Sequence, residues 1–196
     1  NAASFPERIA ASMENEQLSY AELNGAGNAM ARALAERGIG HGDRVVCWAD
    51  TSLEVLPLFV GLAKLGAIFA PLNARLVPDE AGDILAWAKP KLLVADAERA
   101  EAAQTLAMAQ GIPFGAIGTA AAMSGTDLTL AASTCSRDEV QCAGLTESDP
   151  HVIFFTSGFK GSSSTNPSAR CACFRFSTWR RLRWPSRPGR RRGRSC

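Results

Sequence analysis

The sequence has little histidine, a single tyrosine and no acidic residue after position 149. Neither of its two histidines, His41 and His151, stands near cysteines at a metal-ligand spacing. The six cysteines form no CxxC pair, so the pattern excludes the usual structural zinc sites. Isolated cysteines of this kind predict a reducing, cytoplasmic compartment.

Long uninterrupted apolar runs are also missing. The longest apolar stretch, residues 55–72, is broken by Pro57, Lys64, Gly66 and Pro71, so we expect no transmembrane segment. Asn1 is not followed by a basic segment and an apolar core, and we therefore expect no signal peptide.

Charge is distributed very unevenly along the 196 residues. The formal net charge is +2, yet residues 1–158 hold all 19 acids with 10 basic residues, a net −9. Residues 159–196 hold 11 basic residues and no acid, a net +11. The charge thus divides the chain into an acidic first part and a basic tail.

The first part predicts helices alternating with short apolar strands. Ser19 and Glu22 have the spacing of a capping box, and Gly38 is a natural stop for the helix that they begin. Thr51 and Glu54 repeat that spacing. We expect helices over 5–13, 19–37, 51–65 (bent at Pro57), 78–88 and 97–110, a short helix at most within 118–148, and strands over 44–49, 67–70, 91–95, 112–117 and 151–155. This order predicts a layered α/β domain with a parallel sheet.

The last expected strand carries the main candidate site. His151 to Phe155 is typical of a strand buried on both faces, and Thr156, Ser157 and Gly158 follow it. Open α/β folds bind ligands at the carboxyl ends of such strands. Backbone N–H groups, two hydroxyls and a glycine can cradle a phosphate, although the same residues also suit an ordinary turn.

Five short segments occur in an order that resembles the adenylate-forming enzymes, and the acyl-CoA synthetases most of all. They lie at residues 18–24, 38–45, 65–73, 149–150 and 155–158. The resemblance implies the partial N-terminal, AMP-binding domain of such an enzyme over residues 1–158.

Enzymes of that family use Mg-ATP to convert a carboxylic acid, such as a fatty acid, to an acyl-adenylate, and then transfer the acyl group to coenzyme A. The resemblance therefore implies ATP, magnesium and coenzyme A as cofactors. By position it assigns Thr156, Ser157, Gly158 and Gly161 to the loop that binds the pyrophosphate end of ATP, where charge develops on the leaving group.

The sequence departs from the family after Gly158. Phe159 and Lys160 replace two expected hydroxyl residues, and the expected Pro-Lys pair is absent. Lys160 either reaches a phosphate as a point charge or is an ordinary surface lysine. The family's Tyr-Gly-x-Thr-Glu segment, its ribose-binding aspartate and its C-terminal lysine have no counterpart in this chain. We therefore expect no catalytic residue here and an inactive chain.

Residues 159–196 are rich in arginine, serine and proline, and they show no regular apolar period. They can be interpreted as a disordered, solvated tail, as an arginine-rich arm that binds nucleic acid or an acidic partner, or as the out-of-frame product of a frameshift after Gly158. The frameshift explains both the change in composition and the interrupted motif. Nucleic acid is thus not the favoured partner, although a non-catalytic binding or regulatory role is the alternative to a ligase fragment.

Overall fold

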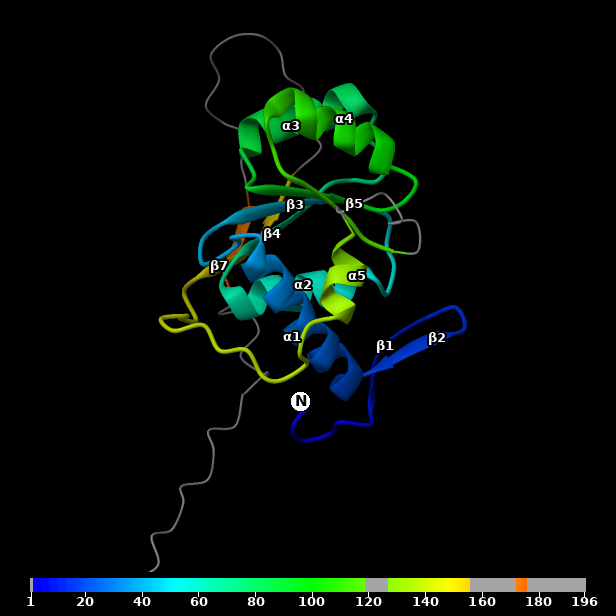
Figure 1. The fold of residues 1–196 in the computed structure, drawn as a ribbon, viewed down its shortest axis with the longest axis vertical. Coiled ribbons are helices and arrows are strands. Elements are labelled where there is room, and N and C mark those ends of the chain that lie inside the picture. The colour runs from blue at the N-terminus through cyan, green and yellow to red at the C-terminus, as the bar shows by residue number, and fades with distance from the viewer. Residues whose placement is uncertain (1, 119–126, 156–171, 176–196) are drawn as a thin grey trace, which may run out of the picture.

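A parallel sheet between two layers of helices forms the body of the protein (Figure 1). The computed structural model describes residues 2–118, 127–155 and 172–175. Its strands are β1 (Ile9–Met13), β2 (Glu16–Ser19), β3 (Arg44–Trp48), β4 (Ile68–Pro71), β5 (Leu92–Ala95), β6 (Phe114–Ala116), β7 (Pro150–Phe154) and β8 (Ala172–Arg175). Its helices are α1 (Tyr20–Glu36), α2 (Val55–Leu65), α3 (Pro78–Ala88), α4 (Ala100–Gln110) and α5 (Leu128–Ser133).

The main sheet has the strand order β6-β5-β3-β4-β7-β8. Strands β3 to β7 pair in parallel, whereas β8 is antiparallel to β7. The expected α/β class and parallel sheet are confirmed. None of the helices in the described part of the chain is long and apolar enough to cross a membrane.

Alternating side chains along each central strand divide the core into two halves. Val45 and Cys47 of β3 pack with α1, α2 and α5, while Val46 and Trp48 pack with α3 and α4. Figure 1 shows the same division, with α3 and α4 on one face of the sheet and α1, α2 and α5 on the other. Burial on both faces explains why these strands are continuous apolar runs.

Several helix ends follow the local signals. Ser19 caps α1, accepting from the Glu22 N–H at 3.2 Å, while the Glu22 carboxylate accepts from the Ser19 N–H at 2.8 Å. Gly66 and Gly111 end α2 and α4 in the left-handed conformation that glycine favours. Pro78 is the first residue of α3, as expected.

The helix expected over residues 5–13 is wrong. Residues 9–13 form β1, which pairs with β2 in an antiparallel hairpin. Glu14 has φ 51°, and positive φ suits the two-residue turn between Met13 and Glu16. A short apolar run does not distinguish helix from strand, and here pairing with the following segment decides.

The second capping box is also wrong. Helix α2 begins at Val55, and its N-cap Glu54 makes no capping hydrogen bond. The Thr51 N–H instead donates to the Asp50 carboxylate at 3.0 Å. Pro57 is the third residue of α2, where a backbone N–H has no intrahelical acceptor to lose, so the bend predicted there has no physical cause.

Strand β7 is less covered than the sequence suggested. His151 and Ile153 are each 8 % exposed, but Phe154 is 46 % exposed, so burial on both faces is incomplete. The tail was expected to be disordered throughout, and this is wrong for residues 172–175, which form β8. The rest of residues 159–196 lies outside the described residues.

Candidate functional site at the carboxyl edge of the sheet

The carboxyl ends of β3, β4, β5 and β7 meet at one edge of the sheet because these strands are parallel. The expected phosphate loop begins directly after β7. Its residues Thr156, Ser157, Gly158 and Gly161, like Lys160, lie outside the described residues, so their assignment stays a prediction. The described part of this edge includes the segments that follow β3, β4 and β5.

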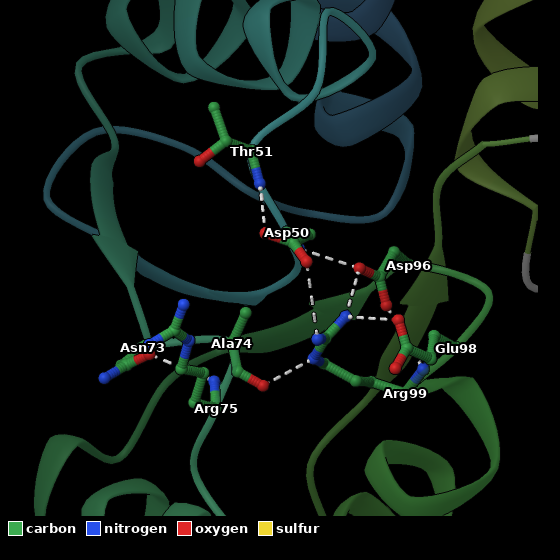
Figure 2. A network of polar contacts seen from close by, with 8 residues as sticks. All are labelled: Asp50, Thr51, Asn73, Ala74, Arg75, Asp96, Glu98 and Arg99. Atoms are coloured by element: carbon green, nitrogen blue, oxygen red, sulfur yellow. Dashed lines mark hydrogen bonds and ion pairs between the residues drawn. The ribbon is translucent and has the colours of Figure 1, made fainter.

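A cluster of charged side chains joins these three strand ends, and Arg99 lies at its centre (Figure 2). The guanidinium of Arg99 donates to Asp96 Oδ2 at 2.6 Å and to the Ala74 carbonyl at 2.8 Å. Its Nη2 lies 3.7 Å from Asp50 Oδ2. Only 12 % of the Arg99 side chain is exposed, so the arginine is fixed between the strand ends.

The carboxylates of this cluster accept hydrogen bonds from donors within the cluster itself. Asp96 accepts from the backbone N–H groups of Asp50 and Arg99, at 2.7 and 3.1 Å. In the loop after β4, the Asn73 side chain accepts from the Arg75 N–H at 3.0 Å, which closes a tight local turn. We interpret the cluster as a frame that fixes the geometry of the edge beside the expected phosphate loop.

Sequence reasoning missed Arg99, Asp96 and Asp50. A signal was present, because an aspartate follows each of two buried strands: Asp50 stands two residues after β3, and Asp96 directly follows β5. The third partner is a backbone carbonyl in another loop. No local pattern could have shown that contact.

Cys47, which lies in β3 below this edge, is chemically quiet. Burial, followed by the charge of Asp96, raises the pKa of Cys47 to about 12. A thiol with such a pKa is protonated at neutral pH, and the thiolate is the nucleophilic form. Cys47 therefore serves packing in the core.

Replacing Arg99 with methionine is expected to lower the free energy of unfolding by about 2 kcal/mol, because the Ala74 carbonyl loses its guanidinium donor and the Asp96 carboxylate keeps only its two backbone donors. Arg99→Lys should recover only part of the loss, since lysine lacks the planar fork. Urea unfolding measures both values. Arg75→Met is the matched control, because the Arg75 side chain is exposed. Equal stability of the Arg99 and Arg75 methionine variants would contradict a stabilising role of the Arg99 cluster.

A small cavity of about 180 Å³ lies at the opposite, amino edge of the sheet. The cavity is lined mainly by the C-terminal end of α2, the first residues of β7 and the segment before β7. Beside it, His41 Nε2 lies 3.2 Å from Asp149 Oδ2. A hydrogen bond from the Thr146 backbone, and then the bond from His41, hold the pKa of Asp149 below its usual value. These contacts fix the chain where it enters β7.

His151 borders the same cavity and belongs to the core. It is 8 % exposed, and its ring centroid lies 4.5 Å from that of Phe59. Burial lowers the pKa of His151, while a hydrogen bond with the backbone of Ala67 works in the other direction. The imidazole is therefore neutral at pH 7, which suits packing against an aromatic ring.

The described residues hold no cluster of metal-ligating side chains. Within residues 2–118, 127–155 and 172–175, no three or more His, Cys, Asp or Glu side chains gather closely enough to hold a metal ion. The expected magnesium therefore has no ligand set among the residues that the structure describes.

Comparison with known proteins relates this chain to enzymes that act on carboxylic acids. The model of the family described as "AMP-binding enzyme" matches residues 1–162. A curated relative, the long-chain-fatty-acid–CoA ligase FadD13 of Mycobacterium tuberculosis, is 32 % identical over 145 residues. That match covers 74 % of this chain and 28 % of the relative, so the chain spans less than a third of the relative's length.

Solved structures agree with the sequence comparison. The inhibitor-bound N-terminal domain of FACL13 from Mycobacterium tuberculosis has a TM-score of 0.73 with this chain at 25 % identity, covering 91 % of this chain and 44 % of that one. ATP-bound MatB from Rhodopseudomonas palustris has a TM-score of 0.68 at 26 % identity, covering 82 % of this chain and 30 % of that one.

Proposed function

The chain belongs to the AMP-binding enzyme family, and from this membership we propose that residues 1–158 are the N-terminal part of an ATP-dependent ligase that joins a carboxylic acid, specifically a fatty acid, to coenzyme A. The observation that carries the proposal is the family match over residues 1–162, which spans strands β1 to β7 and the residues assigned to the expected phosphate loop. A relative named as a long-chain-fatty-acid–CoA ligase supports the choice of acid.

The proposed chemistry takes place at the carboxyl edge of the sheet. Thr156, Ser157, Gly158 and Gly161 bind the pyrophosphate end of ATP through backbone N–H groups and hydroxyls. Such donors stabilise the charge that develops on the leaving pyrophosphate. Bound Mg²⁺ would neutralise the same charge, and coenzyme A would accept the acyl group. The likeness to an ATP-bound structure supports the nucleotide.

We further propose that the 196-residue chain does not itself catalyse adenylation. Its only tyrosine is Tyr20, its last acid is Asp149 and its last lysine is Lys160, so the family's later adenine, ribose and lysine contacts have no residues to make them. Catalytic groups that act as a set lose nearly all their effect when most are missing.

The abrupt change at residue 159 is best explained by a shift of reading frame, and this stays a hypothesis. The hypothesis rests on the interruption of the expected motif after Gly158 and on the absence of any acid from residues 159–196. Translating the gene in the two other frames beyond codon 158 tests it. A Thr-Gly-x-Pro-Lys-Gly continuation is expected, and its absence from both frames would defeat the hypothesis.

We propose the reducing cytoplasm as the compartment of this protein, because its cysteines are isolated in the sequence.

A chimera tests the proposed function. Residues 1–158 replace the matching N-terminal segment of the long-chain-fatty-acid–CoA ligase of Mycobacterium tuberculosis, and fatty-acid-dependent ATP–pyrophosphate exchange is measured. We expect exchange within about 100-fold of the parent enzyme, the loss expected from small errors in positioning. A chimera that melts cooperatively but shows no acid-dependent exchange would contradict the proposal.

The same chimera tests the phosphate loop. Ser157→Ala should reduce kcat by on the order of 100-fold, as removal of one donor to a developing oxyanion does in other enzymes. Ser12→Ala, at an exposed position of β1, is the control and should leave kcat unchanged. Equal rates for the two variants would remove Ser157 from the proposed site.

A further inference from the structure

Strand β7 has two neighbours, and the outer one comes from the basic tail. On the inner side a register pair, Phe69 with Val152, joins β7 to β4. On the outer side β8 runs antiparallel along β7, with Phe154 opposite Ala172 and Ile153 opposite Cys173. Val152 with Phe174 and Pro150 with Arg175 complete four register pairs, so more of β7 is aligned with β8 than with β4.

The composition of β7 is that of an interior strand. His151 and Ile153 are each 8 % exposed, and the strand carries no lysine, glutamate or aspartate of the kind that protects sheet edges. Without β8, its outer edge would present a row of unpaired N–H and C=O groups. Edges of this type template pairing with another chain.

We propose that the outer edge of β7 is a strand-acceptor site, and that residues 172–175 of the same chain fill it. Strand addition depends on main-chain hydrogen bonds, and it therefore tolerates many sequences. A tail read out of frame can fill the site as well as a selected one, so this inference is independent of the proposed ligase function. The segment also blocks the edge against a second copy of the chain.

Disulfide trapping tests the register directly. Phe154→Cys and Ala172→Cys are introduced with Cys171→Ser and Cys173→Ser, and the dilute full-length chain is oxidised mildly. Directly opposite residues have Cβ atoms about 4.5–5.5 Å apart, close enough for a bridge after a small adjustment. Peptide mapping by mass spectrometry should find the 154–172 bridge as the main product.

The matched control moves one cysteine out of register. Phe154→Cys with Leu182→Cys, in the same serine background, places the second thiol ten residues further along the tail. A yield of the 154–172 disulfide at least about tenfold higher than that of the 154–182 disulfide supports the acceptor site. Without strand pairing the two yields should be similar, because the free energy of loop closure depends only weakly on loop length. Equal yields would overturn it.

Proline substitution tests the backbone pairing without new thiols. Cys173→Pro with Phe174→Pro removes two N–H groups from β8, whichever of them faces β7. We expect hydrogen exchange of the β7 amides to quicken by about tenfold or more and the chain to associate into dimers or larger species. Arg191→Pro with Arg192→Pro is the control. Unchanged exchange and an unchanged monomer in the Cys173/Phe174 variant would contradict the proposal.

Discussion

Replacing Gly61 with valine is expected to lower the free energy of unfolding by about 3 kcal/mol, the upper range for overpacking a close contact. Gly61 lies in α2 where this helix crosses α1, and the two helices lie together under the sheet (Figure 1). A Cβ at Gly61 would lie 3.0 Å from the Ala31 backbone N and 3.2 Å from the Gly27 carbonyl. Backbone atoms cannot rotate aside, so the helices must separate.

Urea unfolding followed by tryptophan fluorescence measures this change. Gly25→Ala is the matched control in α1, because a Cβ there meets only the flexible Arg137 side chain, at 3.4 Å. Alanine should stabilise that position by up to about 1 kcal/mol through its helix propensity. If Gly61→Val unfolded at the same urea concentration as the parent chain, the close packing of α1 on α2 would be wrong.

Replacing Asn28 with alanine should cost about 3 kcal/mol of stability, since the buried amide of Asn28 is lost and two part-buried backbone groups lose their partner. Asn28 is 1 % exposed in the middle of α1. Its amide donates to the Arg137 carbonyl at 2.9 Å and its carbonyl accepts from the Val140 N–H at 3.3 Å. These two bonds attach the segment before β7 to the helical layer.

A second contact supports the same attachment. Lys64 of α2, with 7 % of its side chain exposed, lies 2.8 Å from the Glu139 carboxylate. Partial burial acts to raise the pKa of Glu139, but hydrogen bonds from Lys64 and Asn24 prevail and hold it below the usual value. Residues 137–140 are therefore held by side chains of both α1 and α2.

Asn24→Ala is the control for Asn28→Ala. Asn24 lies one turn earlier in α1 and makes a surface hydrogen bond to Glu139 at 3.3 Å, so its loss should change stability by no more than about 0.5 kcal/mol. Urea unfolding of both variants gives the comparison. Equal and small effects would show that the segment before β7 is not fixed through Asn28.

Local chemistry accounts for what the sequence predicted well. The capping box of Ser19 with Glu22, the glycines that end α2 and α4, and Pro78 at the start of α3 each act within a few residues. These short-range signals predict the helix ends correctly because no long-range contact overrides them. Apolar runs between such signals then predicted strands β3 to β7 to within a few residues.

Long-range contacts account for what the sequence did not predict. Strand β1 exists because β2 pairs with it, and β8 exists beside β7 despite the composition of the tail. Asp50 joins the Arg99 cluster, and the expected cap at Thr51 does not form. At the candidate site, the strand order predicted the edge of the sheet that carries the site, but the contacts of Arg99 depend on three loops meeting.

The central proposal is that residues 1–158 are the N-terminal part of an ATP-dependent ligase and that the 196-residue chain does not by itself catalyse adenylation. Fatty-acid-dependent ATP–pyrophosphate exchange by the purified 196-residue chain tests it most directly, with the chimera of residues 1–158 as the positive control. The account predicts exchange by the chimera and none above the acid-free background by the chain itself. Acid-dependent exchange by the unaltered chain would contradict it.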